Sequence, residues 1–113
     1  MTADLVALCR ERPDRNAVTA ALGAAGAELR VAGDPAGALV RLLDRAGGHL
    51  FAVEGPILVE VSGEVERLLG RPMAAPVWWV EVRAVSGRDD AFEAARRFAE
   101  RLVGTLGGEV WAG

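Results

Sequence analysis

Runs of hydrophobic and polar residues divide the chain into alternating strands and helices. Residues 4–9, DLVALC, form a nearly unbroken apolar run, which is typical of a strand buried on both faces. Residues 50–53 repeat this pattern, so we expect a second central strand there. Residues 27–33, AELRVAG, alternate between apolar and polar positions, as an edge strand with one exposed face does. The first half of the chain therefore predicts two central strands and one edge strand.

Helical periodicity and capping residues predict two helices between these strands. Asp14 precedes a stripe of apolar residues at helical spacing, and Gly26 follows that stripe as a stop signal. Residues 34–48 begin with Asp34 as a cap and Pro35 at the first helical position, and they end on two glycines. We predict a helix in each segment.

The middle of the chain is ambiguous between a hairpin and a second buried strand. Gly55 and Pro56 are expected to break the strand that begins at residue 50. Residues 57–61, ILVEV, then form either a hairpin partner or another buried strand. Ser62 is expected to cap a short helix that ends at Gly70.

The last third of the chain predicts a strand, a long helix and a terminal strand. Residues 76–85 alternate and include two adjacent tryptophans. Asp90 and Glu93 resemble a capping pair at the start of a helix over residues 90–106. Residues 109–112, EVWA, are expected to form the final strand. The buried stripe of the long helix consists of Ala91, Ala95, Phe98, Leu102 and Leu106.

This alternation predicts an α/β fold for residues 1–113 as a single domain. Strands that alternate with helices imply crossover connections and a mainly parallel, doubly wound sheet with helices on both faces. An edge strand that is second in sequence fits the order 2-1-3 of flavodoxin-like folds. The alternative is an α+β fold with an antiparallel edge, in which residues 57–61 and 77–85 pair and one face of the sheet stays open.

Composition narrows the classes of partner. The 113 residues are 51% hydrophobic, enough for one core without disulfides or metals. The net charge is -3 and the arginines are interspersed with acids, which argues against nucleic acid and membrane partners. The N-terminus lacks a signal-peptide pattern, and the single cysteine fits a reducing compartment, so we expect a cytoplasmic protein. The chain has no Lys, Tyr or Gln, which indicates a G+C-rich bacterial genome and explains why every basic residue is arginine.

One motif combines a nucleophile with an anion-binding residue. Cys9 and Arg15 match the pattern C-x5-R in CRERPDR, between a predicted strand and a predicted helix. This resembles the phosphate loop of low-molecular-weight protein tyrosine phosphatases and arsenate reductases. The resemblance implies that the cysteine is a nucleophile and that the arginine holds the oxyanion. Pro13 removes a backbone donor from this loop, and Asp14 adds negative charge to it.

The rhythm of residues 4–70 also resembles the receiver domain of response regulators. In that alignment Glu54 takes the place of the phosphoacceptor aspartate, and Glu11 lies near the metal-binding acids. The family's invariant lysine has no counterpart, because the chain contains no lysine. The resemblance implies a degenerate receiver that is not phosphorylated.

Other catalytic chemistry is sparse. His49 is the only histidine, and neither serine lies in a nucleophile elbow. One histidine and one cysteine do not form a typical zinc site. The glycine-rich stretches match no nucleotide-binding fingerprint. We therefore expect no metal and no cofactor.

The tryptophan strand supplies the strongest positive signal. Alternation places Trp78 toward the core and Trp79, Glu81 and Arg83 on the other face, where either the long helix or a partner covers the second ring. Tryptophan and arginine are frequent in binding hot spots, and Trp111 is expected to extend the patch. These four residues predict a binding surface.

Three functions follow as hypotheses. The first is a non-enzymatic module that acts through contact with a protein partner or through self-association. The second is a small phosphatase or reductase that uses Cys9 and Arg15. The third is a small-ligand-binding domain, with its site at the strand ends near Arg10, Arg12 and Glu54.

Overall fold

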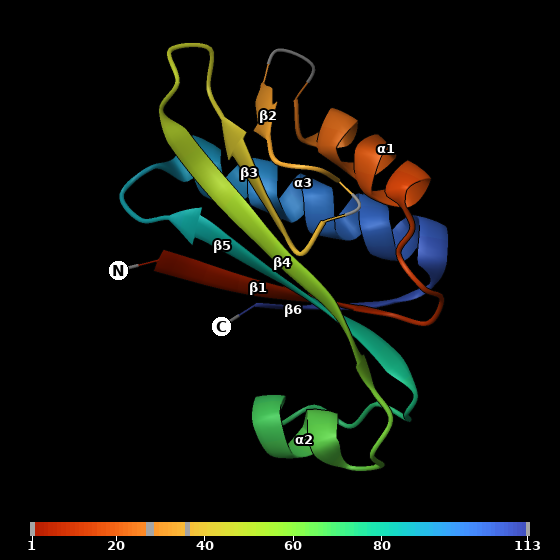
Figure 1. Ribbon diagram of the computed structural model, residues 1–113. Coiled ribbons are helices and arrows are strands. Elements are labelled where there is room, and N and C mark those ends of the chain that lie inside the picture. The colour runs from red at the N-terminus through yellow and green to blue at the C-terminus, as the bar shows by residue number, and fades with distance from the viewer. Residues whose placement is uncertain (1, 27–28, 36, 113) are drawn as a thin grey trace.

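The structure combines one sheet with three helices (Figure 1). It is a computed structural model that describes residues 2–26, 29–35 and 37–112. The elements in chain order are β1 (Thr2–Cys9), α1 (Arg15–Ala25), β2 (Arg30–Ala32), β3 (Leu39–Leu43), β4 (His49–Val59), α2 (Glu64–Leu69), β5 (Val77–Val85), α3 (Asp89–Leu106) and β6 (Gly108–Ala112).

The sheet is antiparallel throughout. Its six strands lie in the order β2-β3-β4-β5-β1-β6, and every neighbouring pair is antiparallel. The prediction of a parallel, doubly wound, flavodoxin-like sheet with the order 2-1-3 is therefore wrong. The fold is α+β. The receiver resemblance implied a parallel sheet, and the antiparallel sheet contradicts it.

The error arose in residues 34–48, which form a strand and a tight loop where a helix was predicted. Val40 and Leu42 of β3 are buried, whereas the residue between them is exposed, so the segment alternates as a strand. After the strand, the carboxylate of Asp44 accepts a hydrogen bond from the backbone N–H of Gly48 at 2.7 Å and so closes the β3–β4 loop. The leucines of this segment fit both periods, and pairing with β4 selected the strand.

Gly55 and Pro56 also act differently from the prediction, because they form a bulge inside β4. The pairing of β4 with β5 shifts register between Glu54 and Ile57. Gly55 has φ +111°, and a Cβ there would lie 2.8 Å from the carbonyl oxygen of Trp79. The strand then continues to Val59, antiparallel to β5, as the α+β alternative anticipated.

Both long helices pack on the same face of the sheet. Figure 1 shows α1 and α3 together on one side of the strands, with α2 at the far end of β4 and β5. We call this side the helix face; its core includes Phe51, Val82 and Phe98. Helices do lie on both faces, as predicted, but both long helices share one face, and the prediction of α3 over Trp79 is wrong. On the opposite face, the open face, α2 covers only a small cluster around Val6 and Leu8.

Several local predictions are confirmed. The first strand, the tryptophan strand, the terminal strand and the helices near residues 15–25 and 89–106 are present. The short helix ends at Gly70 as predicted, but its N-cap is Gly63 and Ser62 does not cap it. The edge strand is β2, and residues 27–28 of that prediction lie outside the described residues. Among the described helices none has the length and apolar character needed to cross a membrane.

Candidate functional site

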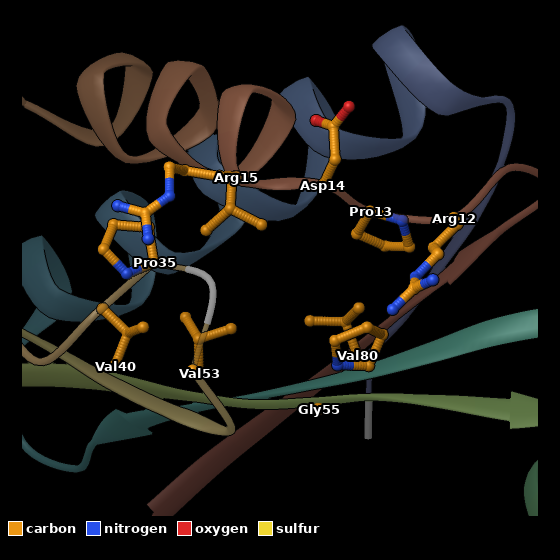
Figure 2. A pocket seen from close by; sticks show the side chains of 12 residues that line it. Arg12, Pro13, Asp14, Arg15, Pro35, Val40, Val53, Gly55 and Val80 are labelled. Atoms are coloured by element: carbon orange, nitrogen blue, oxygen red, sulfur yellow. The ribbon is translucent and has the colours of Figure 1, made fainter.

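A cavity of about 330 Å³ lies where α1 begins over the helix face (Figure 2). Four separate stretches of chain meet there: the β1–α1 loop with the first turn of α1, the segment before β3, the bulge of β4, and β5. The described residues that line it are Arg12, Pro13, Asp14, Arg15, Val18, Pro35, Gly37, Val40, Val53, Gly55, Pro56 and Val80.

The floor of the cavity is apolar. Val40, Val53 and Val80 come from three adjacent strands and point toward α1, because each occupies an inward position of its strand. All three are largely buried in the helix-face core. Val18 of α1 closes the cavity from the opposite side. Any molecule in this space would therefore rest on aliphatic side chains.

Arg12 provides the first basic group at the rim. Its guanidinium lies 5.5 Å from the centroid of the Trp78 ring, within the range of a cation–π contact. Within the part of the chain that the structure describes, this ring is the only interaction partner of the Arg12 guanidinium. Figure 2 shows the side chain reaching into the cavity from the β1–α1 loop, on the side of Val80 and Gly55.

Arg15 provides the second basic group but is already paired. Its guanidinium lies 3.1 Å from a carboxylate oxygen of Asp34 across the mouth of the cavity. Both side chains are exposed, so solvent screens this pair and it contributes little to stability. The pair does link the start of α1 to the segment before β3.

Asp14 faces away from the cavity, although it belongs to the lining. Its carboxylate caps α1 by accepting a hydrogen bond from the backbone N–H of Ala17 at 2.8 Å. In Figure 2 the carboxylate points outward, opposite to the floor. The Asp14 carboxylate therefore caps α1 and does not point into the cavity.

The bulge of β4 joins the cavity to a neighbouring hollow. Gly55 lines both, and its backbone N–H donates to the carbonyl oxygen of Ala38 at 3.1 Å, which holds the segment before β3 against the bulge. The hollow also includes Arg12, and it extends to Ile57 and Trp78. The two spaces adjoin each other and share Arg12, Gly37, Gly55 and Pro56 in their linings.

Cys9 does not lie in the cavity. Its side chain is fully buried in the helix-face core, and burial raises the pKa of the thiol to about 12. A thiol with this pKa stays protonated at neutral pH, whereas nucleophilic attack requires the thiolate. Arg15 lies near the cavity and pairs with Asp34. The predicted pair is therefore not arranged as a phosphate loop.

The remaining predicted acids and Arg10 are dispersed. Glu54 lies within β4, 3.8 Å from the guanidinium of Arg83, and it lines the hollow beside Arg12 without lining the cavity. Glu11 is exposed in the β1–α1 loop. Arg10 donates to the carbonyl oxygen of Ala74 at 2.7 Å, away from the cavity. Over the described residues, no group of three or more His, Cys, Asp or Glu side chains is placed to hold a metal ion.

The structure does bring together the predicted patch on the open face. Trp79, Glu81, Arg83 and Trp111 line a smaller pocket of about 120 Å³ with Leu69 of α2. The indole N–H of Trp79 donates to Glu81 at 3.3 Å, and Arg83 donates to the other carboxylate oxygen of Glu81 at 2.9 Å. This hydrogen bond raises the pKa of Arg83 above its ordinary value. The second tryptophan is thus partly covered by α2.

Sequence reasoning found Arg12 and Arg15 but missed most of the cavity. The prediction of a helix over residues 34–48 hid the contribution of Pro35 and Gly37. The signal was present, because AGDPAG is rich in turn residues. Asp34 closes a turn there through its carbonyl oxygen, which accepts from the N–H of Gly37 at 2.7 Å.

Comparison with known proteins adds no assignment. The chain matches no family model, and no curated protein or solved structure is significantly similar to it. Its candidate sites therefore depend on their own geometry.

Proposed function

We propose that this protein is a small-ligand-binding domain and that its site is the cavity at the start of α1. The observation that carries the proposal is a space of about 330 Å³ with an apolar floor and two guanidinium groups at its rim. Ligand sites in proteins are typically clefts of about 300 Å³ or more, lined by apolar side chains with a few placed polar groups. The cavity meets this description at the lower end of the size range.

The size of the cavity limits the ligand. One water molecule occupies about 30 Å³ in the liquid, so the space accommodates roughly ten non-hydrogen atoms. The neighbouring hollow allows a substituent to extend past Arg12 toward Trp78. A compact organic molecule fits this space, whereas a dinucleotide does not.

The experiment is a screen of small charged and neutral molecules against the ¹⁵N-labelled protein, read by amide chemical shifts. We expect binding molecules to shift the amides of residues 12, 14–18, 37–40, 53–55 and 80, because these segments enclose the cavity. A screen without any shifts, or with shifts confined to the open face, would contradict the proposal.

A cavity-filling variant provides a second test. Val53→Phe places a larger ring in the floor and should abolish the shifts caused by ligand. Val61→Phe makes the same chemical change at a side chain that is 66% exposed, and it should bind as the wild type does. Equal binding by both variants would place the ligand elsewhere.

A second candidate function is protein contact through the open face. Ile57 pairs with Trp79 across β4 and β5, so both side chains lie on this face, and Ile57 is 62% exposed. An exposed apolar residue beside a tryptophan, on the same face as Arg83, fits a hot spot for self-association. Light scattering over a tenfold concentration range tests this; we expect a dimer that Trp79→Ala and Arg83→Ala weaken. A strict monomer throughout would contradict self-association.

A further inference from the structure

We infer that the ligand of the cavity is a small monocarboxylic acid, whose carboxylate pairs with Arg12 and whose apolar body rests on Val40, Val53 and Val80. The inference depends on the proposed ligand-binding function and specifies its chemistry.

The first argument is the state of the Arg12 guanidinium. A guanidinium carries five N–H donors in a planar fork that matches two carboxylate oxygens. In the described part of the chain, this group interacts only with the face of the Trp78 ring, so its N–H edge remains available to a ligand. The cation–π contact with the ring restrains the guanidinium, and Figure 2 shows the group directed into the cavity.

The second argument is the balance of charge around the cavity. Arg15 is matched by Asp34 at 3.1 Å. Asp14 is committed to the cap of α1 and points away from the floor. Arg12 is thus the one basic side chain on the described lining without a carboxylate partner, because Glu54 of the adjoining hollow pairs with Arg83 at 3.8 Å, and a carboxylate on the ligand would provide that partner.

The third argument is the floor. Three valines from adjacent strands offer no hydrogen-bonding side chain to a bound molecule, so the part of the ligand that covers them should be apolar. A group with two or three charges, such as a phosphorylated sugar, would bury polar atoms there without partners. The N–H donors of Arg12 and the aliphatic floor together favour a short acid with one carboxylate and an apolar body.

The test uses matched pairs of molecules that differ only in charge: hexanoate with hexanamide, and phenylacetate with phenylacetamide. Isothermal titration calorimetry should show each acid binding at least about tenfold more tightly than its amide, because charged hydrogen bonds are stronger than neutral ones. Arg12→Gln should abolish this difference, whereas Arg101→Gln, a matched change on the exposed side of α3, should preserve it. Arg12→Lys keeps the charge but loses the fork, and it should retain only part of the preference for acids.

The outcomes separate the inference from the proposed function. Amides that bind in the cavity as tightly as their acids would overturn the inference and leave the ligand-binding function intact. An acid preference that survives in a folded Arg12→Gln protein would also overturn it. Absence of binding by every compound of the wider screen would remove the proposed function itself. Amide spectra of both glutamine variants verify that they fold.

Discussion

The two faces of the sheet are built in different ways. The helix face buries a continuous core beneath α1 and α3, in which the rings of Phe51 and Phe98 lie 5.7 Å apart. The open face buries only a small cluster beneath α2, and the rest of it carries charged side chains such as Glu54 and Arg83. The cavity lies at the margin of the helix face, where α1 begins.

This difference places most of the stabilising apolar burial on the helix face. Apolar burial dominates the free energy of folding, and most of that burial lies on the helix face. Exposed ion pairs contribute little, so the open face is free to vary in sequence at a small cost in stability. The cavity uses the rigidity of the first face, because its valine floor belongs to the same core.

The largest expected difference between the faces is in thiol reactivity. Cys9 is buried on the helix face with a pKa raised to about 12, so its labelling at pH 8 should be more than about a thousandfold slower in the native protein than in urea. A cysteine placed on α2 by Leu68→Cys, in a Cys9→Ala background, should react rapidly because Leu68 is 50% exposed. Fast native labelling of Cys9 would contradict the buried position.

The same pKa shift predicts the alkaline stability. The unfolded thiol ionises near pH 8.5, whereas the folded thiol ionises near 12, so the free energy of unfolding should fall as pH rises between these values. Cys9→Ala should remove this part of the decline. Urea titrations at pH 8 and pH 10 measure the loss of unfolding free energy between these two pH values. If Cys9→Ala lost as much stability as the wild type, the decline would not come from the Cys9 thiol.

The next effect is the removal of a core ring. Phe98→Ala should lower the free energy of unfolding by about 3–5 kcal/mol, because the side chain is fully buried and faces Phe51. Urea denaturation measures the change. A loss below about 1 kcal/mol would show that the helix face is not the main core.

A smaller effect is expected at the start of α1. Asp14→Ala should cost about 1 kcal/mol, because the backbone N–H of Ala17 loses its acceptor. Asp14→Asn keeps an acceptor oxygen and should cost less. If both variants were equally unstable, the charge of Asp14 and not its cap would be the relevant property.

The smallest effect is expected on the open face. Arg83→Gln breaks the contacts with Glu81 and Glu54, but these side chains are substantially exposed, so the change in unfolding free energy should stay within about 0.5 kcal/mol. A double-mutant cycle with Glu81→Gln measures the coupling. A coupling above about 1 kcal/mol would indicate that this network supports Trp79.

Local signals in the sequence predicted most elements but not their arrangement. Asp14 and Gly26 correctly marked the start and the end of α1. Strand alternation correctly assigned Trp78 to the core side. Residues 34–48 misled because leucines spaced by three and four also satisfy a strand when Val40 and Leu42 are the buried pair. A helix was predicted where the structure has strand β3. With a helix in that place, the strands on either side were expected to be parallel, whereas they belong to an antiparallel sheet.

The cavity was less accessible to sequence reasoning than the patch on the open face. Three members of the patch lie on one strand at alternate positions, so the period of two brings them together. The cavity joins four segments whose proximity depends on strand order and on the bulge at Gly55. No local pattern encodes the strand order, and the signal of Gly55 and Pro56 was interpreted as the end of a strand instead of a bulge within it.

The most direct test of the account is a set of intermolecular nuclear Overhauser effects between a bound carboxylic acid and the valine methyl groups. Hexanoate at saturating concentration should show contacts from its alkyl chain to the methyls of Val40, Val53 and Val80, and to Val18. Contacts to Leu69 and Trp111 instead would move binding to the pocket on the open face. Contacts to neither set would contradict the assignment of the cavity as a ligand site.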